Sequence, residues 1–152
     1  MKYTTTNELE HFEFNEAYIC DMQITSGFFH MYLDNVTILP ENSCNRDIRI
    51  MRANGLLLKI EDFQIDSITR EGYKVYDANG KLMNTCEDEV VEEADFLDVI
   101  KSFSNGTIYS ITKQENKYTF AIDAADERTY QLCISGSNDI EEWERFLNRE
   151  EE

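Results

Sequence analysis

Carboxylates gather more densely than any other chemically active side chains in this sequence, and they are the best candidates for a functional site. Residues 87–98 contain no Lys or Arg, and a second acidic cluster, which begins at Asp139, lies close to the end of the chain. Like charges at this density repel one another and cost stability. Such a surface either keeps the chain soluble or binds a positively charged partner, and both interpretations stay open. The candidate partner-binding residues are Glu87, Asp88, Glu89, Glu92, Glu93, Asp95, Asp98, Glu141, Glu142 and Glu144.

Histidine and cysteine chemistry has no motif to support it. His11 and His30 are the only histidines, and neither lies beside a cysteine. No glycine-rich phosphate loop or calcium-binding loop occurs. The sequence therefore predicts no catalytic residue, no cofactor and no metal ligand, although carboxylates remote in sequence could still assemble an enzyme. No zinc or redox spacing links the cysteines, which we expect to be free thiols: Cys20, Cys44, Cys86 and Cys133.

The overall charge restricts the kinds of partner. Thirty-one Asp and Glu face fourteen Lys and Arg, which gives the 152 residues a formal net charge of −17. Nucleic acid and anionic membranes are unsuitable partners, because binding to either depends on Lys and Arg. A basic protein is a suitable partner, since opposite charges speed encounter.

The chain length suits a single domain that spans residues 1–152. No segment has the ~18 consecutive apolar residues of a transmembrane helix. Met1–Glu10 lacks the apolar core of a signal peptide. We therefore expect a cytoplasmic protein, with frayed ends at residues 1–10 and 149–152.

Alternating apolar residues predict strands over most of the chain. Between Phe12 and Ile24 the apolar side chains fall on even positions, with a break at Glu16, and a switch of parity near Asp34–Asn35 predicts a bulge. Asn54–Gly55 and Asn79–Gly80 are typical of hairpin turns. The first turn predicts that Ala53 pairs with Leu56, and the second that Tyr76 pairs with Met83. Three further strands, centred on residues 109–111, 118–122 and 130–134, are separated by short polar turns and predict a meander.

Two segments change to helical spacing. Residues 90–104 place apolar side chains three and four positions apart, and so do residues 139–148, where Trp143 shares a face with Ile140 and Phe146. We expect Trp143 to anchor the last helix on the sheet. The predicted fold class is α+β: a mainly antiparallel curved sheet or partly open barrel, with two helices at about 90–104 and 139–148.

Two functions fit these features. The first is a non-enzymatic acidic protein-interaction module, an inhibitor or immunity-type protein that neutralises a basic partner. The alternative is a β-sheet or barrel protein that binds a small ligand among its many aromatic side chains. An enclosed apolar pocket would favour the ligand, whereas a core filled by these aromatics would favour the interaction module.

Overall fold

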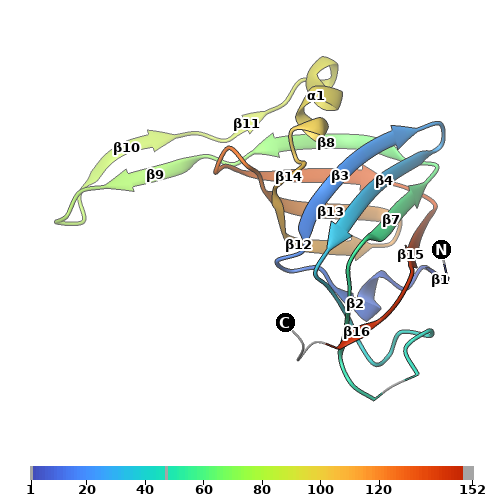
Figure 1. Ribbon diagram of the computed structural model, residues 1–152. Helices are drawn as coiled ribbons and strands as arrows, with labels where there is room; N and C mark the ends of the chain where they lie inside the picture. Colours follow the sequence, from blue (N-terminus) through green and yellow to red (C-terminus); the bar gives the residue numbers. More distant parts are fainter. Residues whose placement is uncertain (1, 47, 149–152) are drawn as a thin grey trace.

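The main element of the computed structural model is a rolled antiparallel sheet, and the structure describes residues 2–46 and 48–148 (Figure 1). Neighbouring strands pair antiparallel throughout, and the sheet does not close, because β1 and β11 form its two edges. A mainly antiparallel, partly open sheet is therefore confirmed. The ten strands, in spatial order, are β1 (Tyr3–Thr6), β15 (Asn138–Trp143), β7 (Leu56–Glu61), β4 (Phe28–Asp34), β3 (Tyr18–Thr25), β12 (Thr107–Gln114), β13 (Lys117–Asp123), β14 (Thr129–Ser135), β8 (Gln64–Arg70) and β11 (Glu89–Val90).

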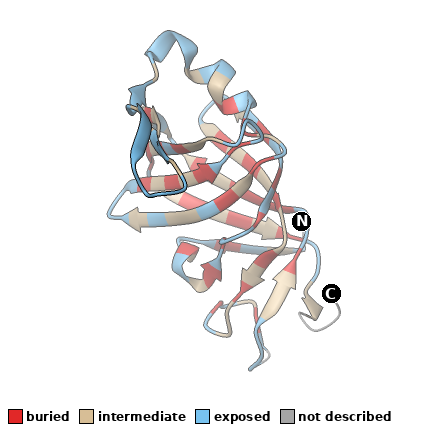
Figure 2. Ribbon diagram, turned by 90° about the vertical axis from the view of Figure 1, so that its left-hand side faces the viewer, coloured by how far each residue is buried: buried red, intermediate tan, exposed pale blue. Residues whose placement is uncertain are grey.

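The core lies between two halves of this sheet that face each other. The halves are joined where β3 meets β12 at the pair Tyr18 with Thr107. Backbone hydrogen bonds on either side extend this junction, since the Ile19 N–H donates to the Gly106 carbonyl and the Ile108 N–H to the Ala17 carbonyl. On one side Phe29 of β4 points inward, and it contacts Phe120 of β13 across the core with ring centroids 5.8 Å apart. Figure 2 shows buried residues alternating with less buried ones along these strands. This alternation follows from the two-residue period of a strand that has one face in the core.

A second, smaller sheet lies below the first. The bulge predicted near Asp34–Asn35 is wrong: β4 ends at Asp34, and Asn35, with φ of 61°, turns the chain from one sheet into the other. Glu16, with φ of 69°, likewise separates the strand predicted from Phe12 to Ile24 into two. The small sheet has the strand order β16 (Leu147–Asn148), β6 (Met51–Ala53), β5 (Val36–Ile38) and β2 (Phe12–Glu13).

The hairpin predicted at Asn54–Gly55 is wrong. Strand β6 pairs with β5 and β16, whereas β7 pairs with β4 and β15. The dipeptide instead carries the chain from the small sheet to the main sheet. It lies beside Asn35, where the chain crosses between the same two sheets in the opposite direction. Side chains lock the two crossings together, since Asn54 Oδ1 accepts from the Asn35 N–H and Asp34 Oδ1 accepts from the Gly55 N–H.

The helix predicted at 90–104 is shorter than expected. Strand β11 takes up Glu89–Val90, a 3-10 turn η2 (Glu93–Asp95) follows, and α1 covers only Phe96–Lys101. The β-branched residues before the turn favour extended backbone, and the Val91 N–H donates to the Ile68 carbonyl of β8. A second 3-10 turn, η1, covers Leu9–His11. No helix among the described residues is long and apolar enough to cross a membrane.

The helix predicted at 139–148 is wrong. Residues 138–143 form β15, between β1 and β7, and β16 follows. Trp143 is fully buried as expected, but in a strand, where it contacts Tyr3 and Phe12. The start of the chain, expected to fray, forms β1 instead because β15 supplies its hydrogen-bonding partner. The predicted fraying of residues 149–152 lies outside the described residues.

A two-stranded hairpin projects from the body (Figure 1). Strands β9 (Tyr73–Tyr76) and β10 (Leu82–Cys86) pair only with each other among the described strands, and we call residues 73–86 the arm. The turn at Asn79–Gly80 is confirmed. Its predicted register is off by one residue, because Tyr76 pairs with Leu82 and Met83 lies in a bulge.

Candidate functional site

The first acidic cluster is fully on the surface. It forms a segment, residues 87–98, that runs from the end of the arm through β11 and η2 into α1 (Figure 1). We call it the acidic segment. All seven of its carboxylates are exposed: Glu87, Asp88, Glu89, Glu92, Glu93, Asp95 and Asp98.

Two of these carboxylates hold the segment against the body. Asp88 Oδ1 accepts a 2.6 Å hydrogen bond from the Gly72 N–H, and Glu89 forms an ion pair with Arg70 of β8. Gly72 has to be glycine, because a Cβ there would lie 2.0 Å from the Cys86 carbonyl oxygen. The other five carboxylates form no ion pair within the described residues. Their charge is therefore available to a partner.

Exposed apolar side chains lie among the carboxylates. Val90 is 76% exposed and Leu97 is 55% exposed, whereas Ile100 on the inner side of α1 is buried. Beside Val90, an open groove of about 440 Å³ runs between the acidic segment and β8, with Arg70 and Tyr130 on its far wall. Apolar residues surrounded by charged ones are typical of an interface with a dry centre and a polar rim.

The second acidic cluster does not form a comparable surface. Asp139 and Glu141 are fully buried, so the prediction that Glu141 contacts a partner is wrong. Glu142 lies on the outer face of β15 and makes a 2.6 Å ion pair with Lys59. Glu144 is exposed. Alternation along a strand explains the split, because successive side chains point to opposite faces.

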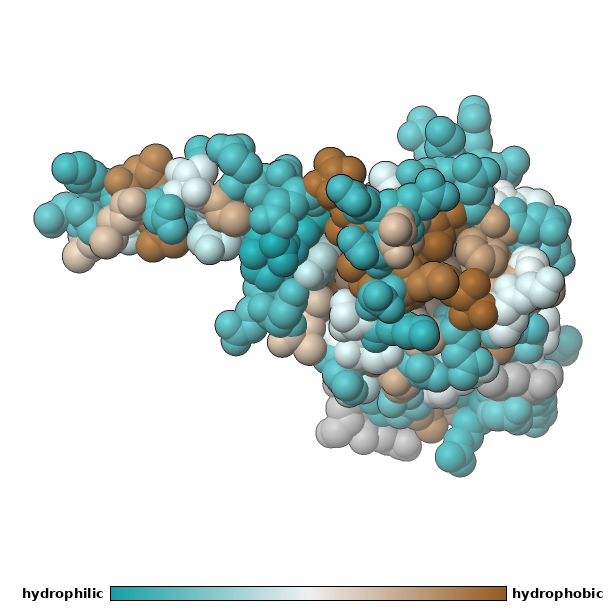
Figure 3. Space-filling model, turned by 90° about the horizontal axis from the view of Figure 1, so that it is seen from above, coloured by the Kyte–Doolittle hydropathy of each residue, from teal (hydrophilic) through white to brown (hydrophobic). Residues whose placement is uncertain are grey.

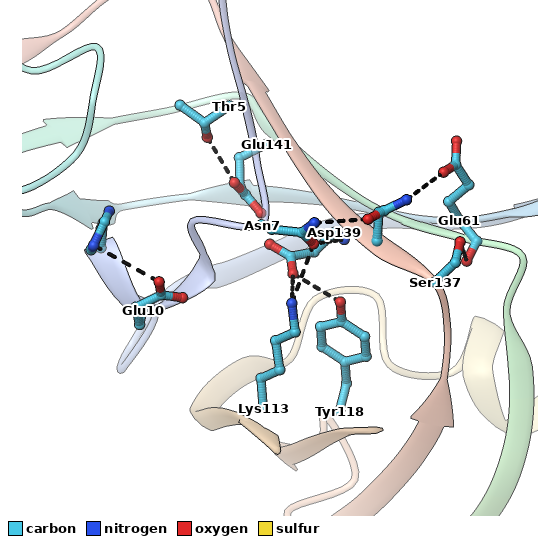
Figure 4. Close-up of polar contacts among 11 residues, drawn as sticks. Thr5, Asn7, Glu10, Glu61, Lys113, Tyr118, Ser137, Asp139 and Glu141 are labelled. Carbon is cyan, nitrogen blue, oxygen red and sulfur yellow. Dashed lines mark hydrogen bonds and ion pairs between the residues drawn. The ribbon is translucent and has the colours of Figure 1, made fainter. Parts of the chain in front are cut away.

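The buried carboxyls of β15 form a cluster with residues from three other strands (Figure 4). Asp139 Oδ1 accepts hydrogen bonds of 2.8 Å from both Lys113 Nζ and the Tyr118 hydroxyl. Glu141 Oε1 accepts a 2.7 Å hydrogen bond from the Thr5 hydroxyl. Asp139 Oδ2 and Glu141 Oε2 meet no other donor among the described residues. They can hydrogen-bond each other only if one of them carries a proton.

The surroundings determine which carboxyl holds that proton. Burial, with the neighbouring Asp139 charge, raises the pKa of Glu141 to about 10. Burial also raises the pKa of Asp139, but hydrogen bonds from Glu141, Lys113 and Tyr118 outweigh it and leave that pKa below its ordinary value. Glu141 is therefore a neutral donor and Asp139 an ionised acceptor at neutral pH. The hydrogen bonds of the cluster link strands β1, β12, β13 and β15. Because Asp139 and Glu141 are both sealed from solvent, a substrate cannot reach them.

The remaining reactive side chains are dispersed. His30 lies between Phe28 and Tyr32, with burial and the Lys59 charge lowering its pKa. The four cysteines are separate free thiols. Within the described part of the chain, no group of three or more His, Cys, Asp or Glu side chains could hold a metal ion.

The interior of the rolled sheet is occupied by its own side chains. Phe29, Tyr118 and Phe120, which could have lined a ligand cavity, are buried in the core at 0–1% exposure. An apolar groove of about 420 Å³ between β3 and α1, beside Ile24 and Leu97, opens to solvent. These three aromatics therefore act as core residues rather than as the wall of an enclosed pocket.

Comparisons of the chain with protein-family models, with curated proteins and with solved structures gave no match. The features that suggest a function are therefore those of the surface itself. Sequence patterns predicted the hairpin at Asn79–Gly80 but not its projection as the arm. The available signal was apolar residues at adjacent positions, Val75 with Tyr76 and Leu82 with Met83, on both sides of the Asn79–Gly80 turn.

Proposed function

We propose that the protein is a non-enzymatic interaction module that binds and neutralises a basic protein, as an inhibitor or immunity-type protein does. The observation that carries this proposal is the acidic segment, in which seven exposed carboxylates share one stretch of chain with the exposed side chains of Val90 and Leu97. The carboxylates attract a positive surface, and the apolar side chains supply area that is buried on contact.

The charge of the whole molecule supports the same partner. A net charge of −17 accelerates encounter with a positive protein and disfavours encounter with another acidic one. The buried Asp139 and Glu141 take two carboxylates out of that surface, but the five unpaired ones of the acidic segment remain. The proposed site of action is the cytoplasm, where reducing conditions keep cysteines as thiols.

The small-ligand alternative has less support. A ligand-binding barrel needs an interior cavity, and here the inward aromatics such as Phe120 pack against each other. Catalysis has less support still, because the buried carboxyls among the described residues, Asp139 and Glu141, are closed to solvent.

Association rates measured at several salt concentrations test the proposal. The variant has Glu87→Lys, Glu92→Lys and Glu93→Lys, which spares the structural Asp88 and Glu89. It is compared with wild type for binding to the basic protein recovered by pull-down from the native host. We expect association about tenfold or more slower at 0.01 M salt. The difference should shrink at 0.15 M, where the Debye length falls to about 8 Å.

A matched control separates local charge from total charge. Glu13→Lys, Glu41→Lys and Glu115→Lys make the same change in net charge at exposed sites outside both acidic clusters. The control should keep most of the wild-type rate. Equal slowing by both triple variants, or no slowing by either, would contradict a specific role for the acidic segment.

A further inference from the structure

The arm exposes apolar side chains that the rest of the molecule does not cover. Figure 3 shows hydrophobic side chains along the arm, well away from the body, and Figure 2 shows the same hairpin as almost wholly exposed. The exposed fractions are 46% for Tyr73, 41% for Val75, 55% for Tyr76, 48% for Leu82 and 67% for Met83. A two-stranded hairpin alone in water is at best marginally stable. An exposed hairpin that carries this many apolar side chains is therefore a candidate binding element.

Apolar side chains lie on both faces of the arm. Tyr73 and Val75 share one face, because they are two residues apart in β9. Tyr76 points to the opposite face, where its cross-strand partner is Leu82. A flat surface could cover only one of these faces. A cleft that receives the arm could cover both.

Side-chain contacts order the arm at its turn and at its base. Asp77 Oδ1 accepts 2.9 Å hydrogen bonds from the N–H groups of Asn79 and Lys81, which fixes the turn. At the base, the Arg128 guanidinium lies 4.9 Å from the centre of the Tyr73 ring and donates to the Glu71 carbonyl. These contacts fix the turn and the direction in which the base leaves the body, while the strands between them can still open. Less conformational entropy is then lost when a partner binds.

Charge indicates what the cleft must look like. Lys74 and Lys81 offset Asp77, so the arm itself is close to neutral, while the acidic segment begins at Glu87, directly after it. A second copy of this chain is a poor occupant, since each copy carries −17. The complementary surface is an apolar cleft with a positively charged rim.

We propose that the arm is the anchor of the interaction. Its tip residues Tyr76, Leu82 and Met83 enter an apolar cleft on a basic protein, while the acidic segment contacts the basic rim of that cleft. This inference rests on the proposed function and adds the binding element and the shape of the partner's site. Aromatic and aliphatic anchors in a fully covered pocket carry most of the energy of such interfaces.

Photocrosslinking in the native host tests the proposal with the full chain. Benzoylphenylalanine is placed at Met83 and, as a control, at Glu115 in the β12–β13 turn. We expect a crosslink from position 83, and not from 115, to a protein with net positive charge. That protein is then purified, and its Kd for the chain is measured with and without Leu82→Ser. The variant should weaken binding roughly 30-fold, the size of a typical anchor residue.

The outcomes separate the arm from the acidic segment. Leu82→Ser should raise the dissociation rate, whereas the charge-reversed acidic segment should lower the association rate. If Leu82→Ser has the wild-type Kd while the charge variant associates slowly, the anchoring role of the arm is overturned and the proposed role of the acidic segment stands. A crosslink to a second copy or to an acidic protein, or no crosslink at all, also overturns it. An unchanged thermal midpoint for Leu82→Ser confirms that the variant is folded, because exposed substitutions change stability by about 0.5 kcal/mol or less.

Discussion

The body and the arm are built from the same kind of hairpin, yet their side chains have opposite surroundings. Tyr118 in β13 is 1% exposed, and Tyr76 in β9 is 55% exposed, although both are strand tyrosines in antiparallel pairs. In the body, the facing half of the sheet covers the inward side chains. In the arm, no second layer of described residues covers either face, and Arg128 contacts it at the base, over the Tyr73 ring. The difference shows that pairing makes a strand, while burial requires a second layer, which the described residues do not supply to the arm.

The largest expected effect is in the body. Trp143→Ala removes a fully buried side chain that contacts Tyr3, Phe12 and Phe146. Such truncations cost about 3–5 kcal/mol, which for a chain of this size lowers the thermal midpoint by about 6–20 °C. Thermal unfolding checks this. Tyr76→Ala is the matched control in the arm and should leave the midpoint almost unchanged, and equal losses from the two variants would contradict the comparison.

A pH-dependent effect is expected from the polar part of the body. Folded Glu141 keeps its proton up to a pKa of about 10, while the unfolded residue releases it near 4.5. The unfolded state therefore binds fewer protons between these values, and stability falls as pH rises. The neutral Glu141→Gln should remove this slope. We expect its stability relative to wild type to rise by more than about 1.4 kcal/mol from pH 5 to pH 9, the equivalent of one pKa unit.

Urea unfolding at several pH values measures that slope. The control is Glu144→Gln, because Glu144 is exposed and should follow wild type. Asp139 does not contribute to the change in stability between pH 5 and pH 9, since its lowered pKa affects stability only at more acidic pH. Parallel pH profiles for wild type and Glu141→Gln would show that Glu141 is not the proton donor of the pair.

The smallest effect on stability is expected from removing the arm. Tyr73 and Cys86 are cross-strand partners, so an Asn-Gly turn can join them in place of residues 74–85. Because the arm covers little of the body, the free energy of unfolding should change by about 1 kcal/mol or less. Urea unfolding of the shortened chain measures this. A much larger loss would make the arm a structural part of the body.

Sequence patterns predicted strands correctly where apolar and polar residues alternate clearly and polar turns separate the segments. The meander of β12, β13 and β14 has clear alternation and polar turns. The sequence of β15 predicted a helix instead of a strand because its inward positions hold Asp139 and Glu141, which conceal the alternation. Those carboxyls are tolerated in the core by Lys113, Tyr118 and Thr5, which are distant in sequence and which no local pattern could connect to them.

The candidate site was predictable only in part. The exposure of the acidic segment follows from its composition, because unpaired carboxylates stay in water. The arm was predictable as a turn with two strands, but not as a projection. Whether a hairpin packs on the body depends on the direction in which its base leaves the sheet. Here contacts at Gly72 and Arg128, far apart in sequence, set that direction.

Hydrogen exchange of the arm, with and without the captured basic partner, tests the central claim most directly. In the free protein, amides of residues 73–86 should exchange much faster than those of β4, because an uncovered hairpin opens easily. Adding the partner should slow the arm amides about tenfold or more and leave β4 unchanged. Slow exchange of the arm in the free protein, or no change when the partner binds, would contradict the account.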